Sequence, residues 1–268
     1  MKVFYSIHQE RLIDICPRFL MSYSKLKGSK REYGKEWMMD SGGFTLKVRE
    51  ENIHISPDKM LDYDWTKDEY ANFILSTDVE VAWTMDYAIR GSESEGIKKK
   101  KMEKTVENAS FLIDRVGRER LGIIIQGMTA DVYLSHLDLY RERGIETKYI
   151  GIGGLGLLPL PQFSVQGIEA IEAVAEHTSS NIHLLGVAPS YLVANPSLLN
   201  HVYSTDTAIW SRFTFGLYHQ SKLLPGLLNE FVVKTEKQVD ELNGSNRLKH
   251  FSSSPLEDVK QRPVLEFK

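Results

Sequence analysis

Hydrophobic residues in this chain gather in short runs, and most of these runs end at a glycine or an acidic residue. The runs lie at 3–7, 36–43, 79–86, 121–127, 148–154, 181–187 and 201–206. Each run is nearly continuous rather than alternating, which is typical of a strand buried on both faces of a parallel sheet. The pattern therefore predicts a parallel sheet inside the molecule.

Amphipathic segments separate these runs. Apolar residues recur at helical spacing over 56–76, 96–117, 129–144 and 164–178, whereas 196–202 is too short to assign. Alternation of strands and helices through about seven or eight units favours a (β/α)₈ barrel, with a doubly wound open sheet as the alternative. We expect one barrel domain over 1–242. The polar stretch 243–268, with its scattered Pro and Ser, is expected to form a tail or an irregular C-terminal wrap.

Composition narrows the class of protein. The single cysteine, Cys16, cannot form an internal disulfide or a cysteine-built zinc site, so we expect a reducing, cytoplasmic environment and no metal or other cofactor. No apolar run approaches the roughly 20 residues that span a bilayer, so no membrane partner is expected. The net charge of −3 does not indicate a general nucleic-acid binder, although it is compatible with a local basic patch.

Polar residues stand where the predicted strands end. They are Asp40, Asp86, Gln126, the pair Gly153 and Gly154, and Asp206. The carboxyl ends of barrel strands form the active-site face, so three carboxylates and one amide should converge there. Any one of them could be a simple cap or turn residue. The group together predicts a site that hydrogen-bonds one polar ligand, with glycines that allow close approach to the backbone.

Other sequence features do not indicate a binding or catalytic site. GIGGLG at 151–156 has the spacing of a dinucleotide-binding fingerprint, but LLPLPQF follows it where that motif needs a helix. The histidines have no metal-ligand spacing. We expect four of them on the surface, namely His8, His54, His136 and His177. Two are expected in the core, His183 and His201. The run KKKK at 98–101 is expected to be a solvated helix face, and Cys16 an inert small residue.

Six motifs in a fixed order resemble the tRNA-guanine transglycosylase superfamily. They are DSGGF at 40–44, TMD at 84–86, IIIQGM at 123–128, YIGIGGLG at 149–156, HLLGV at 183–187 and VYSTD at 202–206. The match covers about 40–210, and the ordered set is more specific than any one motif. The resemblance implies a (β/α)₈ barrel that exchanges guanine in a polynucleotide for a free 7-deazaguanine base.

The resemblance also implies roles for individual residues. Asp206 corresponds to the nucleophile that attacks the anomeric carbon of the sugar, and Asp40 to the general acid and base, although chain spacing alone would let the two trade roles. Asp86 would read the guanine edge. The other implied base contacts are Gln126 and the Gly154 amide at the six-position oxygen, Phe44 and Leu185 on the two ring faces, Ser41 beside the general acid, and Leu155 near the seven-position substituent. Gly153 is a further implied substrate-binding residue.

That chemistry is consistent on its own terms. Exchange with retention at a glycosidic carbon uses one nucleophilic and one protonating carboxylate. An ionised aspartate can accept both the ring N–H and the amino group of guanine, which adenine does not offer side by side. A base taken out of its stack needs walls to hold it.

The sequence departs from the family pattern in ways that favour DNA over tRNA. The zinc site of three cysteines and a histidine that bacterial and eukaryotic tRNA enzymes carry has no counterpart, and Met128, Ala188 and Thr45 replace usual family residues. The chain is most similar to zinc-free enzymes that insert a deazapurine into DNA, which protects DNA from restriction nucleases. Phosphates would need basic residues at the rim, and the candidates are Arg90, Lys98, Lys99 and Arg212.

Several alternatives remain open from the sequence. The substrate could be tRNA, or a free nucleoside handled by the same two aspartates without a basic rim. The chain could be a non-catalytic partner subunit of this superfamily, although both Asp40 and Asp206 are present. It could also be a barrel with unrelated small-molecule chemistry. A partner protein or a homodimer is compatible with each reading.

Overall fold

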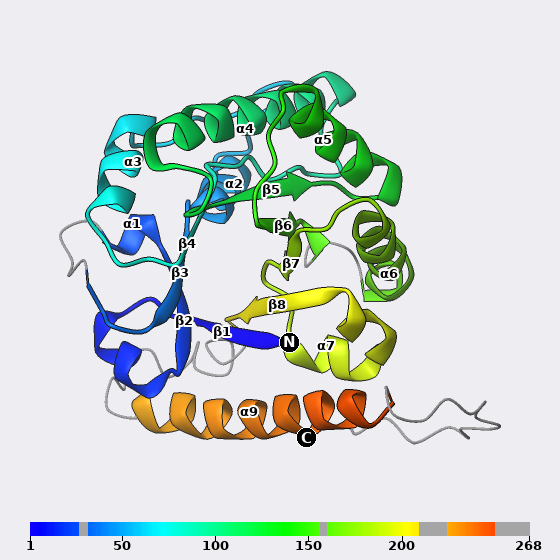
Figure 1. Ribbon diagram of the computed structural model, residues 1–268. Helices are drawn as coiled ribbons and strands as arrows, with labels where there is room; N and C mark the ends of the chain where they lie inside the picture. The colour runs from blue at the N-terminus through cyan, green and yellow to red at the C-terminus, as the bar shows by residue number, and fades with distance from the viewer. Residues whose placement is uncertain (27–31, 156–159, 209–223, 250–268) are drawn as a thin grey trace.

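Eight parallel strands close into a barrel in which the strand order follows the chain (Figure 1). The computed structural model describes residues 1–26, 32–155, 160–208 and 224–249. The strands are β1 (Lys2–Ser6), β2 (Arg18–Ser22), β3 (Glu36–Asp40), β4 (Val81–Trp83), β5 (Leu121–Gln126), β6 (Tyr149–Gly153), β7 (Asn181–Leu184) and β8 (Val202–Thr207). The predicted (β/α)₈ barrel is therefore confirmed, and the open sheet is excluded because β8 pairs with β1.

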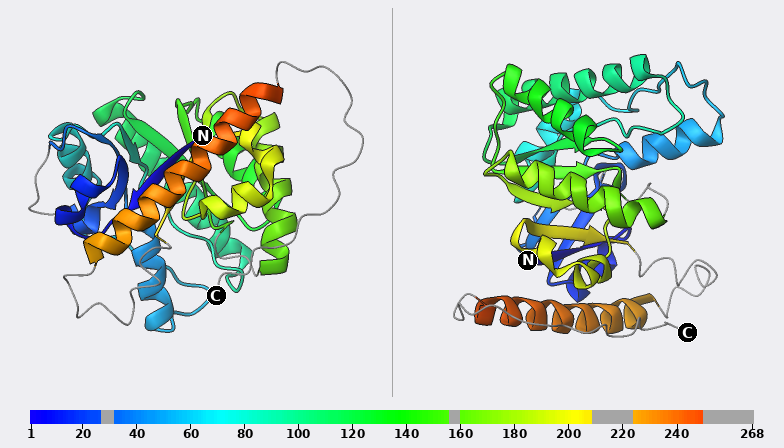
Figure 2. Two further views of the ribbon diagram at one scale, coloured as in Figure 1. Left: turned by 90° about the horizontal axis from the view of Figure 1, so that it is seen from below. Right: turned by 90° about the vertical axis from the view of Figure 1, so that its right-hand side faces the viewer.

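Helices surround this barrel (Figure 1). They are η1 (Glu10–Ile15), α1 (Tyr23–Leu26), α2 (Gly43–Asn52), α3 (Lys67–Leu75), α4 (Glu95–Val116), α5 (Ala130–Glu142), α6 (Leu160–Glu176), α7 (Pro189–Ala194), η3 (Pro196–Asn200) and α9 (Leu224–Lys249). Figure 2 shows α9 crossing the barrel wall beside β1. In the part of the chain so described, no helix combines the length and apolar character needed to cross a membrane.

One tryptophan fills much of the barrel interior. Trp83 belongs to a buried cluster with Phe4, Leu20, Met38, Val81, Ile124 and Tyr149. Its indole needs glycine on the two strands that follow, because a Cβ on Gly122 would lie 2.4 Å from the indole and one on Gly151 would lie 3.1 Å from it. The interior is thus packed with side chains below the rim where the strands end.

Three helical assignments differ from the sequence prediction. α2 begins directly after the DSG turn, at Gly43. The expected helix over 56–76 begins only at Lys67, where Thr66 and Glu69 form a capping box. The expected tail over 243–268 starts too early, because α9 continues to Lys249. Asn243 ties this part of α9 to the barrel by accepting a hydrogen bond from the N-terminal amine at 3.1 Å.

Candidate active site at the carboxyl ends of the strands

The polar residues predicted from the strand ends lie together on one rim of the barrel. Asp40 ends β3, Gln126 ends β5, and Gly153 ends β6. Asp206 lies one residue before the end of β8, and Asp86 follows β4 by three residues. Hydrogen bonds and mutual electrostatic effects connect the three carboxylates and the amide, so the rim is a single polar site.

Asp206 accepts hydrogen bonds from three neighbouring residues. The Ser6 hydroxyl at the end of β1 donates to Oδ2 at 2.6 Å. The Gly186 N–H donates to Oδ1 at 2.8 Å, and Nε2 of His183 lies 3.3 Å from the same oxygen. An ionised carboxylate accepts only, so a surround made of donors suits Asp206 as an anion and fixes its orientation.

Asp40 has a different environment. Its Oδ2 accepts a hydrogen bond from the Gly42 N–H at 3.0 Å. Burial, together with the negative charges of Asp86 and Asp206, raises the pKa of Asp40 to about 7, and the hydrogen bond from Gly42 opposes the shift. A carboxyl group with this pKa can give and take a proton near neutral pH.

Asp86 has both carboxylate oxygens occupied. The Ser41 hydroxyl donates to Oδ1 at 3.1 Å, and the Gln126 amide nitrogen donates to Oδ2 at 2.6 Å. The Tyr63 hydroxyl donates to the Asp86 backbone carbonyl and lies 3.1 Å from the Ser41 hydroxyl. Burial raises the pKa of Asp86, and the hydrogen bonds from Gln126 and Ser41 oppose that shift.

The glycines of the rim make these contacts sterically possible. A Cβ on Gly43 would lie 2.4 Å from Asp86 Oδ1 and 2.8 Å from its backbone oxygen. Gly42 has φ of +96°, in the left-handed region that favours glycine. The two glycines after Asp40 therefore serve distinct purposes, since one allows the turn and the other leaves room for the carboxylate of Asp86.

Gln126 and the glycines of β6 are in contact. A Cβ on Gly153 would lie 2.3 Å from the Gln126 amide nitrogen, and one on Gly154 would lie 3.2 Å from Oε1. Gln126 Oε1 is buried and has no hydrogen-bond partner among the described residues. The amide nitrogen, expected to face a ligand carbonyl, instead donates to Asp86.

The three apolar residues predicted to contact a base differ in how deeply they are buried. Phe44, in the first turn of α2, has 62% of its side chain exposed. Leu185 is partly buried against the Trp83 cluster. Leu155 is fully buried in a second core cluster that includes Tyr133. Its predicted place beside a ligand substituent stays a prediction.

The basic residues predicted to contact phosphates differ in their exposure and in their ion pairs. Arg90 has only 11% of its side chain exposed and pairs with Glu93 at 2.8 Å. Its predicted contact with a phosphate stays a prediction. Lys98 pairs with Glu95 and is mostly covered, while Lys99 is 71% exposed. Arg212 lies outside the described residues.

Sequence reasoning missed four polar contributors. Ser6 gave the same signal as the predicted residues, since it is a polar residue late in an apolar run. Tyr63 lies in a segment expected to be helical. His183 was expected to be a satisfied core residue, without a link to Asp206. His136, expected on the surface, is fully buried, and its Nδ1 accepts a hydrogen bond from the Gln126 N–H at 2.9 Å.

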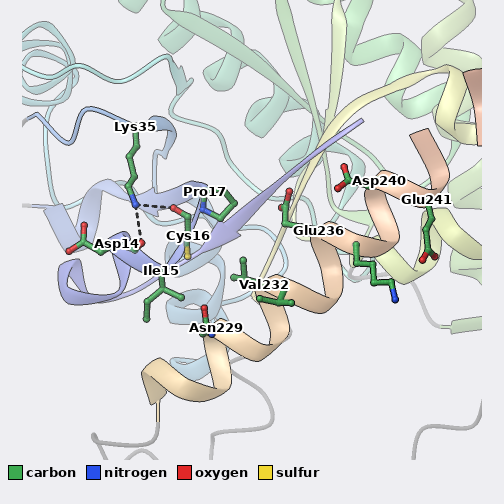
Figure 3. A pocket seen from close by; sticks show the side chains of 12 residues that line it. Asp14, Ile15, Cys16, Pro17, Lys35, Asn229, Val232, Glu236, Asp240 and Glu241 are labelled. Carbon is green, nitrogen blue, oxygen red and sulfur yellow. Dashed lines mark hydrogen bonds between the residues drawn. The ribbon is translucent and has the colours of Figure 1, made fainter. Parts of the chain in front are cut away.

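A groove lies away from this rim (Figure 3). Its volume is about 790 Å³, and it is lined by α9 together with residues that precede β2 and β3. Cys16 lies in this wall, and burial raises the pKa of its thiol to about 12. The groove contains none of the rim carboxylates. Among residues 1–26, 32–155, 160–208 and 224–249, no cluster of His, Cys, Asp and Glu is arranged to hold a metal ion.

Comparison with known proteins adds no further assignment. No protein-family model matches the chain, and a search of curated proteins finds no match.

Proposed function

We propose that this protein is a guanine transglycosylase that exchanges guanine in DNA for a 7-deazaguanine base. The observation that carries the proposal is the pair Asp40 and Asp206, two carboxylates on one rim in opposite environments. Asp206 is surrounded by donors. Asp40 has a pKa of about 7, raised chiefly by burial. Retaining exchange at a glycosidic carbon needs this division into nucleophile and proton carrier.

The first step forms a covalent intermediate. A carboxylate oxygen of Asp206 attacks the anomeric carbon of the sugar, the glycosidic C–N bond breaks, and the proton of Asp40 passes to the leaving guanine. The sugar is then esterified to Asp206, and the polynucleotide backbone stays intact.

The second step reverses the first with a new base. Asp40, now ionised, takes a proton from the incoming 7-deazaguanine, and the base nitrogen attacks the anomeric carbon. The ester bond breaks, and Asp206 leaves as a carboxylate. Asp40 is protonated again, so the cycle closes without a cofactor or an external reductant.

Asp86 is the proposed reader of the guanine edge. Its two oxygens now accept one hydrogen bond each from Ser41 and Gln126, and guanine likewise offers two donors side by side, its ring N–H and its amino group. Base binding would exchange one set of donors for the other. The released Gln126 amide nitrogen could then donate to the carbonyl of the base.

The preference for DNA rests on the single cysteine and on the resemblance described above. The test is to incubate the protein with guanine-labelled duplex DNA, and separately with labelled tRNA, together with a panel of 7-deazaguanine bases. Label release and nucleoside mass spectrometry report exchange. We expect deazaguanine in DNA, no exchange by Asp206→Asn, and normal exchange by Asp138→Asn, an exposed control on α5.

The outcomes separate the alternatives. Exchange into tRNA alone would replace DNA as the substrate while keeping the chemistry. Release of guanine from free nucleosides only would indicate a nucleoside-acting enzyme. No reaction with any of the three would contradict the proposed function and favour a non-catalytic subunit.

A further inference from the structure

His183 is a buried polar residue that the mechanism above does not use. It lies on β7 with no exposed surface. Its ring stacks on Trp83, with centroids 5.0 Å apart and planes 29° apart, and it meets Phe4 edge to face with centroids 6.0 Å apart. Two aromatic neighbours therefore hold the imidazole in one orientation.

Both ring nitrogens of His183 have partners. Nδ1 lies 2.8 Å from the Ser204 hydroxyl, and Nε2 lies 3.3 Å from Asp206 Oδ1. Ser204 and Asp206 are two positions apart on β8, so both side chains point to the same face of the strand. Because a carboxylate can only accept, Nε2 carries a proton toward Asp206, and the Ser204 hydroxyl can donate to Nδ1 and fix that tautomer.

The contacts distinguish the two oxygens of Asp206. Among the residues that the structure describes, Oδ1 has two donors, the Gly186 N–H and His183 Nε2, whereas Oδ2 has the Ser6 hydroxyl. Oδ2 therefore keeps more free lone-pair capacity and is the better attacking atom. Oδ1 would become the carbonyl oxygen of the ester, and its negative charge would return when the ester breaks.

We propose that His183 is a positioning residue that, with the Gly186 N–H, stabilises Asp206 as the leaving carboxylate in the second step. This inference rests on the proposed function. Donors aimed at an oxygen where charge develops act on the step that creates the charge. Removing the His183 donor should therefore slow breakdown of the covalent intermediate more than its formation, and the intermediate should accumulate.

Two substitutions separate this role from simple packing. His183→Phe keeps a ring between Trp83 and Phe4 but removes both nitrogens. His183→Gln keeps a side-chain N–H that can reach Asp206. For both variants we would measure the exchange rate, the KM for DNA and the fraction of protein trapped as a denaturation-resistant DNA adduct. Thermal melting confirms that each variant is folded.

The expected result for His183→Phe is a kcat about tenfold to a hundredfold lower, the range of a lost hydrogen bond to a charged group. Its trapped adduct should rise, its KM should stay within about threefold of the original, and His183→Gln should recover most of the rate. If the unsubstituted protein is active and its His183→Phe variant exchanges bases at the same rate, only this inference is overturned. A loss of rate with less adduct and no rescue by Gln would also overturn it. An original protein that forms neither adduct nor product would contradict the proposed function, and this inference with it.

Discussion

At the scale of single residues, Asp40 sets the expected pH dependence. Burial and the charges of Asp86 and Asp206 raise its pKa to about 7, so its protonated form is present below that pH and disappears above it. Because the leaving guanine needs that proton, single-turnover release of labelled guanine should fall about tenfold per pH unit above 7. A rate that stays flat from pH 6 to pH 9 would exclude Asp40 as the acid.

The same group makes stability depend on pH. Its folded pKa of about 7 exceeds the ordinary value of 3.8, so the native state binds more protons between those values and loses stability as pH rises through them. Asp40→Asn cannot ionise. At pH 8 we expect its free energy of unfolding in denaturant to exceed that of the original protein by about 1 kcal/mol or more. Near pH 4 the two free energies of unfolding should match. Equal stability at pH 8 would contradict the assigned pKa.

At the scale of elements, a buried ion cluster joins α2, α4 and the segment after β4. Lys101 Nζ contacts Glu50 at 2.8 Å and Glu93 at 2.6 Å, and it also donates to the Ala88 carbonyl. Arg90 completes the cluster through Glu93. This cluster anchors the segment that carries Asp86, so it links the helical shell to the active-site rim.

Lys101→Met should destabilise the protein by about 3–5 kcal/mol, because it removes the cation in closest contact with both buried carboxylates and leaves Arg90 alone to balance them. Lys99→Met is the matched control on the same helix. Its side chain is 71% exposed, so the change should stay within about 0.5 kcal/mol. Urea unfolding of both variants measures the difference, and similar midpoints would show that the cluster contributes little.

Periodicity predicted the elements better than it predicted single buried polar residues. Seven strand runs were visible because parallel strands are apolar throughout, but β2, whose apolar residues lie between Arg18 and Ser22, was missed. Lys101 and His136 were expected in solvent. Their burial depends on partners far away in the sequence, such as Glu50, which no local pattern reveals.

The predicted site shows the same contrast. Strand ends located Asp40, Asp86, Gln126 and Asp206 because barrel topology places all carboxyl ends on one rim. The positions of the strand ends did not show which of these residues would hydrogen-bond to each other. Hydrogen bonds such as that from Gln126 to Asp86 depend on side-chain positions across strands.

At the scale of the whole molecule, α9 packs on the wall near the barrel closure. Leu228 and Val232 belong to the main core, and Glu236 accepts hydrogen bonds from Tyr5 and Arg18 on the first two strands. Leu228→Ala should cost about 2–5 kcal/mol through a buried cavity. Val233→Ala on the same helix, at a side chain 62% exposed, is the control and should change little. Comparable losses for both variants in thermal or urea unfolding would contradict this packing.

The fit of Trp83 against Gly122 and Gly151 restricts the order in which this barrel can evolve. A side chain gained first at Gly122 would collide with the indole, whereas a smaller residue gained first at position 83 leaves a cavity that a later methyl group can fill. The two changes are therefore strongly non-additive, and only one order has an intermediate without a steric clash. Because His183 stacks on the same indole, each such path also alters the support of Asp206, so the history of the barrel interior and that of the rim are coupled.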